Sequence, residues 1–403
     1  MVFDEVTHEK GIIVIEGHAA FFAGDSIVKV VESVIDELKA VGGSPTPAII
    51  VALRQSSEPV VASAAPQIID VALGTMRAER LGKRVHNWLF TDRMAEQCTH
   101  PQIAAHHAVP FRGCAHVLEI CTGAGIDTAA LASVSGRVTT YEADLLVAAL
   151  TTGNIRRAGI RNVDVVPNAW TGLNEGAEEY DAVWADPSRR SSRGRIRMST
   201  EYEPPLDTIP NAEIIGIKVG PGDVVADQGF VSEYIGYGKE CRERILWRSP
   251  HITMPAVSLV DRFVTWNLGA NSAPFVVPNA HYIIEPHNAI IASGNVGAFF
   301  AEIGAGVFDS KIAYGALNEE PPASQWYERY KVLRIEKGIS VRRIQESIRE
   351  LGWGPTTIFK KRGWENDPED LRRALSFASG GPPGVVIVMR VGDGHQTVFA
   401  QLV

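Results

Sequence analysis

The chain has 403 residues, 45% of them hydrophobic, and a formal net charge of −8 at pH 7. This length predicts two or three domains with packed cores, and no apolar run is long enough to span a membrane. The four cysteines are scattered without a C-x-x-C pair, which excludes a disulfide framework and a zinc site and favours a reducing, cytoplasmic location. The first residues show no charged-then-apolar leader, so neither a secretory nor a transit signal is expected.

Residues 1–95 are predicted to form a mainly helical domain. Apolar residues recur at helical spacing from Ile27 to Leu38, and a second apolar stripe runs over residues 66–82. Such stripes are more often ordinary core than a binding surface. A lid or a dimer surface is the alternative role.

The segment VLEICTGAGID (117–127) predicts a buried strand, a glycine turn and a following helix. Dinucleotide enzymes use G-x-G-x-x-G here, but Thr128 occupies the third glycine position, and Glu119 precedes Gly123 by four residues. A turn without a pyrophosphate to bind, with a carboxylate nearby, favours the sulfonium cofactor S-adenosylmethionine over NAD. Cys121 is expected to be a small core or lining residue.

Further strands follow in the order that a nucleoside-binding α/β sheet requires. The second, over 138–142, ends in Glu142, whose carboxylate can accept hydrogen bonds from both ribose hydroxyls. The third, over 163–169, ends in Asn168, which can bond an adenine edge. The fourth, over 180–187, delivers Asp186 and Pro187 to the carboxyl edge of the sheet, where ligands of open α/β folds bind.

A basic loop follows that acid. Arg189, Arg190, Arg193, Arg195 and Arg197 lie within eleven residues of Asp186. Arginine forks can pair with phosphate or carboxylate, so Arg189 and Arg190, which lie nearest the strand, are predicted to bind substrate. Pairing with local acids in a solvated loop is the alternative.

The methyltransferase domain is predicted over 96–270, a connecting region over 271–325 and a small α/β domain over 326–403. The last domain alternates a helix at 341–351, a strand at 356–360, a helix at 368–377 and a strand at 384–390. It holds 13 Lys and Arg against 9 Asp and Glu, whereas the whole chain is acidic. The basic run at Lys360, Lys361 and Arg362 either meets phosphates or forms a solvated edge.

Several motifs together resemble class I S-adenosylmethionine-dependent methyltransferases, specifically a bacterial group with a C-terminal THUMP-like domain. They are EQCTHPQIAAHHAVPF (96–111), DPSRR (186–190), EPPL (203–206), KVGPG (218–222), ECRERILW (240–247), YIIEP (282–286) and FKKRGWENDPEDLRRAL (359–375). The resemblance implies an α/β fold with a Rossmann-like class I methyltransferase sheet, an N-terminal helical region and a THUMP-like domain.

The segment 99–111 also resembles the lead-in of RNA cap guanine-N2 methyltransferases. Thr99 and His106 match that pattern, which makes His106 a predicted substrate-binding residue. His107 and Pro110 stand where that family has arginines, and His100 stands where it has proline.

The predicted site contains three groups of residues and no metal. For an amine acceptor, Asp186 and the carbonyl of Pro187 can accept N–H hydrogens and direct the lone pair at the methyl group, so both are predicted to be catalytic. Arg189, Arg190 and His106 are predicted to bind substrate. The predicted cofactor-binding residues are Glu119, Thr122, Gly123, Gly125, Asp127, Glu142, Asn168 and Ala169.

Three functions remain open at this point. The first is methylation of a nitrogen of an RNA base, in tRNA or rRNA, although the acidic charge weighs against it. The second is methylation of a small metabolite, for which an anionic acceptor is one option, and the absent arginines at positions 107 and 110 favour it. The third is a non-catalytic S-adenosylmethionine- or RNA-binding protein, which the intact set of acids and glycines disfavours.

Overall fold

The computed structural model describes residues 18–172, 180–191, 194–195, 198–225, 229–270 and 273–403, and the side chains of residues 190–197 lie outside this description. The chain forms two compact units. The first contains Met1–Glu233 and Glu243–Thr253, and the second contains Tyr234–Arg242 and Met254–Val403. The finer division into four regions at 95, 270 and 325 remains a prediction.

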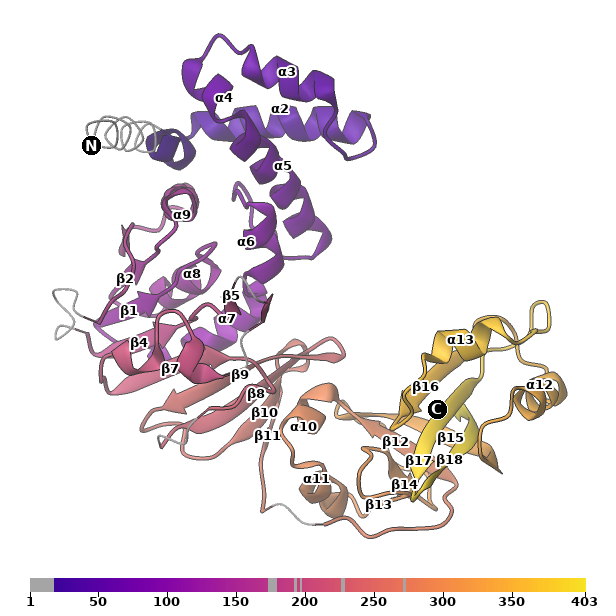
Figure 1. Ribbon diagram of the computed structural model, residues 1–403. Coiled ribbons are helices and arrows are strands. Elements are labelled where there is room, and N and C mark those ends of the chain that lie inside the picture. The colour runs from indigo at the N-terminus through magenta and orange to yellow at the C-terminus, as the bar shows by residue number, and fades with distance from the viewer. Residues whose placement is uncertain (1–17, 173–179, 192–193, 196–197, 226–228, 271–272) are drawn as a thin grey trace, which may run out of the picture. The chain divides into compact units, whose positions relative to one another are not determined.

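The described part of the N-terminal region is helical, as predicted (Figure 1). The apolar stripe of α2 is buried from Ile27 to Leu38, and that of α5 is buried from Ala65 to Ala78. Both contribute to one hydrophobic core, which stabilises the helices by removing their apolar faces from water. The helices are α2 (Ser26–Ala40), α3 (Pro47–Arg54), α4 (Pro59–Ser63), α5 (Ala65–Arg80), α6 (Asp92–Gln97) and α7 (Pro101–Ala108).

The centre of the first unit is a parallel sheet in the order β7-β4-β1-β2-β3. After β1 the chain adds β2 and β3 on one side and then crosses to add β4 on the other, so a topological switch point lies between β1 and β4. All four strands predicted from the sequence are confirmed. The elements are β1 (His116–Ile120), α8 (Ile126–Ala132), β2 (Arg137–Tyr141), α9 (Leu145–Arg157), β3 (Val163–Val166), β4 (Ala182–Ala185) and β7 (Ile214–Val219).

Antiparallel strands extend this sheet beyond β7 in the order β11-β10-β8-β9-β7. Strand β9 pairs with β7, with Lys218 opposite Ile245. These strands are β8 (Val231–Tyr237), β9 (Glu240–Arg248), β10 (Ala256–Leu259) and β11 (Val264–Asn267). The short strands β5 (Arg190–Ser191) and β6 (Gly194–Arg195) pair with each other.

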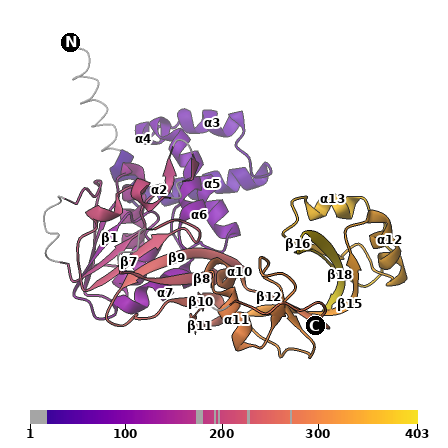
Figure 2. The ribbon, with the colours of Figure 1, turned by 60° about the horizontal axis from the view of Figure 1, so that its bottom comes forward.

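A separate sheet forms the core of the second unit, in the order β13-β14-β12-β15-β18-β17-β16. Helices α12 and α13 lie beside the strands β15 to β18 of this sheet (Figure 2). Residues of β17 alternate between its two faces: Val386 and Val388 pack with α12 and α13, whereas Ile387 and Met389 pack against the opposite core. Three of its strands, β12 to β14, come from the predicted connecting region. The elements are β12 (Tyr282–Pro286), α10 (Asn288–Ala292), α11 (Val296–Glu302), β13 (Gly306–Val307), β14 (Gly315–Leu317), β15 (Tyr327–Lys337), α12 (Val341–Glu350), β16 (Ile358–Arg362), α13 (Pro368–Arg373), β17 (Val385–Val391) and β18 (Gly394–Leu402).

Candidate active site

The turn after β1 adopts backbone conformations that explain its glycines. Gly123 and Gly125 have φ angles of 53° and 83°, in the left-handed region that glycine tolerates. A Cβ atom on Gly125 would lie 2.9 Å from Thr151 Cγ2, whereas one on Gly123 would meet nothing within 4 Å. Cys121 has a φ of 68° without being a glycine, and such strained residues concentrate at functional sites. The turn therefore exposes its backbone beside open space.

Glu142, at the end of β2, fixes the shape of this turn. Its carboxylate accepts hydrogen bonds from the backbone N–H groups of Gly123 and Asp144, each at 3.0 Å. Burial raises the pKa of Glu142 from its ordinary value, although both hydrogen bonds oppose that shift. Asn168 and Ala169 lie exposed after β3, and the Asn168 side chain accepts a bond from the Ala169 N–H.

Glu119 lies inside the protein, with 1% of its surface exposed. Its Oε2 accepts hydrogen bonds from the hydroxyls of Thr128, at 2.5 Å, and Thr122, at 3.4 Å. Burial raises the pKa of Glu119 to about 8, so the carboxyl group is mostly protonated at neutral pH. The residue thus connects β1 to the start of α8 as a neutral hydrogen-bonding group.

Buried charged side chains converge near the end of β4, and we call them the charge cluster. The His107 ring lies between Asp127, at 2.9 Å from Nδ1, and Glu243, at 2.6 Å from Nε2. Lys218 Nζ lies 3.2 Å from the same Glu243 and 2.9 Å from Asp186 Oδ2. The charge cluster consists of His107, Asp127, Asp186, Lys218 and Glu243. Thr99 joins its two halves, because Thr99 Oγ1 contacts both Lys218 and Asp127.

Mutual attraction keeps four members of the charge cluster ionised: His107, Asp127, Lys218 and Glu243. Burial alone would lower the pKa of His107, but Glu243 and Asp127 raise it to about 9. Burial would likewise lower the pKa of Lys218, and Asp186 and Glu243 hold it above its ordinary range. Lys218 and His107 in turn overcome the burial of Glu243 and lower its pKa to about 2. Two cations and two carboxylates balance in these four residues, and an ionised Asp186 brings the cluster to a net charge of −1.

Asp186 is the member of the charge cluster that reaches solvent, with 28% of its side chain exposed. Burial raises the pKa of Asp186, and Lys218 opposes that shift. The Oδ1 atom has no hydrogen-bond partner among the residues that the structure describes. A carboxylate with one oxygen fixed by Lys218 and the other available can accept an N–H hydrogen from an incoming group.

The predicted substrate-binding residues lie in different surroundings. Arg189 Nη1 lies 4.0 Å from Asp223 Oδ2, which also accepts a 2.6 Å hydrogen bond from the Tyr202 hydroxyl. His106 pairs with Glu233 at 2.7 Å. The side chain of Arg190, like those of Arg193, Arg195 and Arg197, lies outside the described part of the structure. Arg189 thus has a local acid, Asp223, within ion-pair distance, as the alternative interpretation expected. The role of Arg189 in substrate binding stays a prediction.

Lys218 and Glu243 were not among the predicted site residues, and His107 was named only because it stands where the RNA cap guanine-N2 methyltransferases have an arginine. A signal was present: Lys218 is the one charged residue in the apolar strand IIGIKV, all of whose residues are buried. Burying a lone ammonium is costly unless a carboxylate faces it, so such a lysine predicts a buried acid. The described residues contain no group of three or more His, Cys, Asp or Glu that could hold a metal ion. Within the same residues, no helix has the length and apolar character needed to cross a membrane.

Comparison with known proteins places this geometry in a recognised fold. Two curated proteins of Mycobacterium tuberculosis, from strains CDC 1551 / Oshkosh and ATCC 25618 / H37Rv, are each named an uncharacterized S-adenosylmethionine-dependent methyltransferase. Each is 27% identical to this chain over 357 residues, which cover 83% of this chain and 96% of the relative. No protein-family model matches the chain.

A solved structure of a presumed methyltransferase from Porphyromonas gingivalis W83 superimposes with a TM-score of 0.72 at 17% identity. The match covers 94% of this chain and 97% of that one. The predicted fold class, an α/β protein with the Rossmann-like sheet of class I methyltransferases, is therefore confirmed.

Proposed function

We propose that this protein, an S-adenosylmethionine-dependent methyltransferase, transfers its methyl group to a nitrogen of an RNA base. The enzyme class and the cofactor predicted from the sequence are confirmed through the two mycobacterial relatives. The non-catalytic alternative is therefore not retained. The identity of the methyl acceptor is the part that we propose.

For the cofactor, the proposed site is the turn at Gly123 and Gly125 together with Glu142. The open space beside Gly123 supports ligand access to the backbone. Glu142, which contacts Gly123, is proposed to accept hydrogen bonds from the ribose hydroxyls. Asn168 and Ala169 are proposed to contact the adenine. Thr122, Asp127 and the protonated Glu119 support the turn from inside the protein.

We choose the methyl acceptor from the net charge of the charge cluster. A sulfonium donor is cationic, so a local charge of −1 favours its binding. An anionic acceptor would need a cation without a carboxylate partner. Among the described residues of this site, Lys218 faces Asp186 and Glu243, and Arg189 faces Asp223. A neutral acceptor that donates N–H groups, such as a nucleobase, fits this site better than an anionic metabolite.

In-line methyl transfer requires the acceptor nitrogen to point its lone pair at the methyl carbon. Asp186, with one oxygen held by Lys218, is proposed to accept an N–H hydrogen of the base, and the Pro187 carbonyl is proposed to accept a second. As the N–C bond forms and the C–S bond breaks, the nitrogen becomes acidic. The Asp186 carboxylate is then positioned to take up its proton.

RNA as the source of that base is supported by the separate C-terminal unit. Its last segment, residues 326–403, has an excess of four cations in an acidic chain and the alternating α/β pattern of the THUMP-like module that we propose for it. Arg189, Arg190 and His106 are proposed to contact the RNA near the acceptor base. We further propose a cytoplasmic location, consistent with Cys98, Cys114, Cys121 and Cys241 being free thiols.

The test is methyl transfer from radiolabelled S-adenosylmethionine to total tRNA and rRNA of a strain that lacks the gene. The label should enter RNA, be released by ribonuclease and be found on one base. Asp186→Asn should lower kcat roughly 100-fold or more while S-adenosylhomocysteine binding stays unchanged. The control is Asp164→Asn, an exposed aspartate on the edge strand β3. Label in a small metabolite and none in RNA would contradict the proposal.

A further inference from the structure

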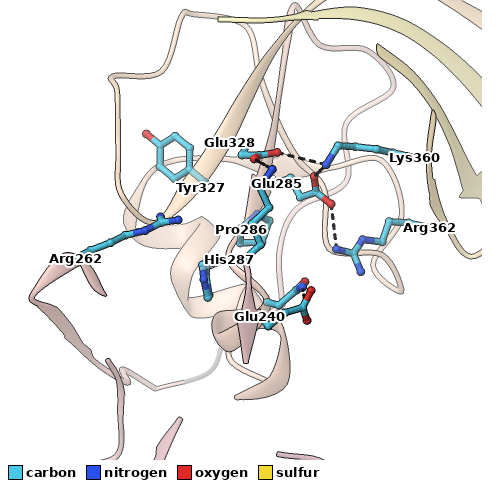
Figure 3. A pocket seen from close by; sticks show the side chains of 11 residues that line it. Glu240, Arg262, Glu285, Pro286, His287, Tyr327, Glu328, Lys360 and Arg362 are labelled. Atoms are coloured by element: carbon cyan, nitrogen blue, oxygen red, sulfur yellow. Dashed lines mark hydrogen bonds and ion pairs between the residues drawn. The ribbon is translucent and has the colours of Figure 1, made fainter. Parts of the chain in front are cut away.

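The second unit contains a pocket of about 200 Å³ that lies wholly within it (Figure 3). Its walls come from segments far apart in the sequence: the turn between β8 and β9, the segment before β11, and strands β12, β15 and β16. The volume is below the roughly 300–1,000 Å³ of pockets for drug-sized ligands, so it suits a small head group.

One side of the pocket carries a tightly paired set of charges (Figure 3). Lys360 Nζ lies 2.5 Å from Glu285 and 3.3 Å from Glu328, and Arg362 lies 3.1 Å from Glu285. Lys239 adds a contact to Glu328 at 2.6 Å. Three cations thus share two carboxylates, and this set has a net charge of +1.

Arg262 lines the pocket without a carboxylate partner among the described residues. Its guanidinium donates hydrogen bonds to two backbone carbonyls, those of Gln325 and, at 3.2 Å, Gly238. These bonds hold the side chain in place but do not neutralise its charge. His287 adds no charge to the pocket, because burial lowers its pKa below the ordinary value.

Glu240 is the opposing charge on the pocket wall. It is exposed, and its partner is the amide of Asn288 at 3.4 Å rather than a cation. The pocket therefore has four cations against three carboxylates, with an immobilised arginine as the cation least compensated by protein acids. Beside these charges, Tyr327 and Pro286 provide apolar surface.

We propose that this pocket binds a phosphate group, with Arg262 as its anchor. A guanidinium fixed by backbone carbonyls loses little entropy on binding, and its remaining N–H groups match the oxygens of a phosphate. The set of Lys239, Lys360 and Arg362, which carries one more charge than Glu285 and Glu328 neutralise, supplies further attraction. The phosphate ester can extend its organic part over Tyr327 and Pro286. Nothing in this inference depends on the methyl acceptor.

The test is calorimetric titration of the full chain with inorganic phosphate, adenosine 5′-monophosphate and adenosine, each in the presence of saturating S-adenosylhomocysteine, which occupies the proposed cofactor site. Both phosphates should bind and adenosine should not. Arg262→Gln should weaken phosphate binding by roughly tenfold or more, which corresponds to about 1.4 kcal/mol or more, because it removes the charge-assisted hydrogen bonds of the guanidinium. The matched control is Arg349→Gln, an exposed arginine on α12 that does not line the pocket.

A second variant distinguishes a change in the pocket from unfolding of the protein. Glu240→Gln removes the opposing charge and should tighten phosphate binding by roughly threefold, a gain that a damaged protein would not show. Lack of binding of both phosphates at millimolar concentration would overturn the proposal. Equal affinity in the wild type and Arg262→Gln, or no gain in Glu240→Gln, would also overturn it.

Two sources of the phosphate are distinguished by competition. A 5′-phosphorylated oligoribonucleotide that displaces adenosine 5′-monophosphate, where the 5′-hydroxyl oligonucleotide does not, would identify an RNA end as the ligand. Displacement by free nucleotides alone would identify a small phosphate ester. Either result supports a phosphate-binding pocket.

Discussion

The stability of the first unit should depend on pH in a way that reports on the charge cluster. His107 is 1% exposed and lies between Asp127 and Glu243, which raise its pKa from 6.5 to about 9. A group whose pKa is raised by folding stabilises the protein fully below its unfolded pKa, and that contribution is lost as the pH rises through the folded pKa. At about 1.4 kcal/mol per pKa unit, His107 should contribute about 3 kcal/mol below pH 6.5, most of it lost by pH 9.

Glu243→Gln is the perturbation that tests this reasoning. It removes one of the two anions that face His107, so the folded pKa of His107 should fall and the loss of stability should begin at lower pH. Near pH 6 the variant should be less stable by about 3 kcal/mol, at the low end for breaking a buried ion pair, because Asp127 and Asp186 still compensate His107 and Lys218.

Urea denaturation at intervals between pH 5.5 and 9.5 measures both effects. The control is Glu213→Gln, which removes an exposed carboxylate and should reproduce the wild-type profile. Wild-type stability that stays level from pH 6.5 to 9 would refute the reasoning. So would a Glu243→Gln profile parallel to that of the wild type.

Three other results are expected. Glu142→Ala should weaken S-adenosylhomocysteine binding by roughly tenfold or more in calorimetry, because two ribose hydroxyls would lose a charged acceptor; unchanged affinity would remove Glu142 from the site. Lys218→Met should raise the pKa of Asp186, since Lys218 lowers it, and should move the acidic limb of the kcat/KM profile to higher pH; an unmoved limb would separate Asp186 from catalysis. Cys121 should resist alkylation at pH 8 in peptide mapping, because burial raises its pKa far above the ordinary value; rapid labelling would show a reactive thiolate.

The arrangement of the residues at the strand ends could be predicted from the sequence because it is local. Gly123, Glu142 and Asp186 each follow directly after a buried strand, and the carboxyl ends of parallel strands meet at one edge of a sheet. The period and order of the apolar runs are therefore enough to predict that these residues lie close together.

The charge cluster could not be predicted in the same way. Lys218 meets Glu243 because β9 pairs antiparallel with β7. His107 reaches α8, 20 residues later in the sequence, and also β9, more than a hundred residues later. The spacing of residues along the sequence does not show which distant strands and helices come into contact. Only the cost of burying Lys218 in an apolar strand indicates that a partner exists.

The contacts of the basic run at Lys360, Lys361 and Arg362 could not be predicted from the sequence either. The sequence left open whether Lys360 and Arg362 meet phosphates or solvent. The structure gives both an internal partner, Glu285, from a strand more than seventy residues earlier. It also brings in Arg262, which the sequence did not distinguish from other surface arginines.

Methylation of an RNA base nitrogen by this protein can be tested in the cell by mass spectrometry of nucleosides. Total RNA would be compared between a strain with the gene and one without it. We predict that one base-methylated nucleoside disappears without the gene and returns with the wild-type gene but not with Asp186→Asn. Identical nucleoside profiles in the two strains would contradict the account.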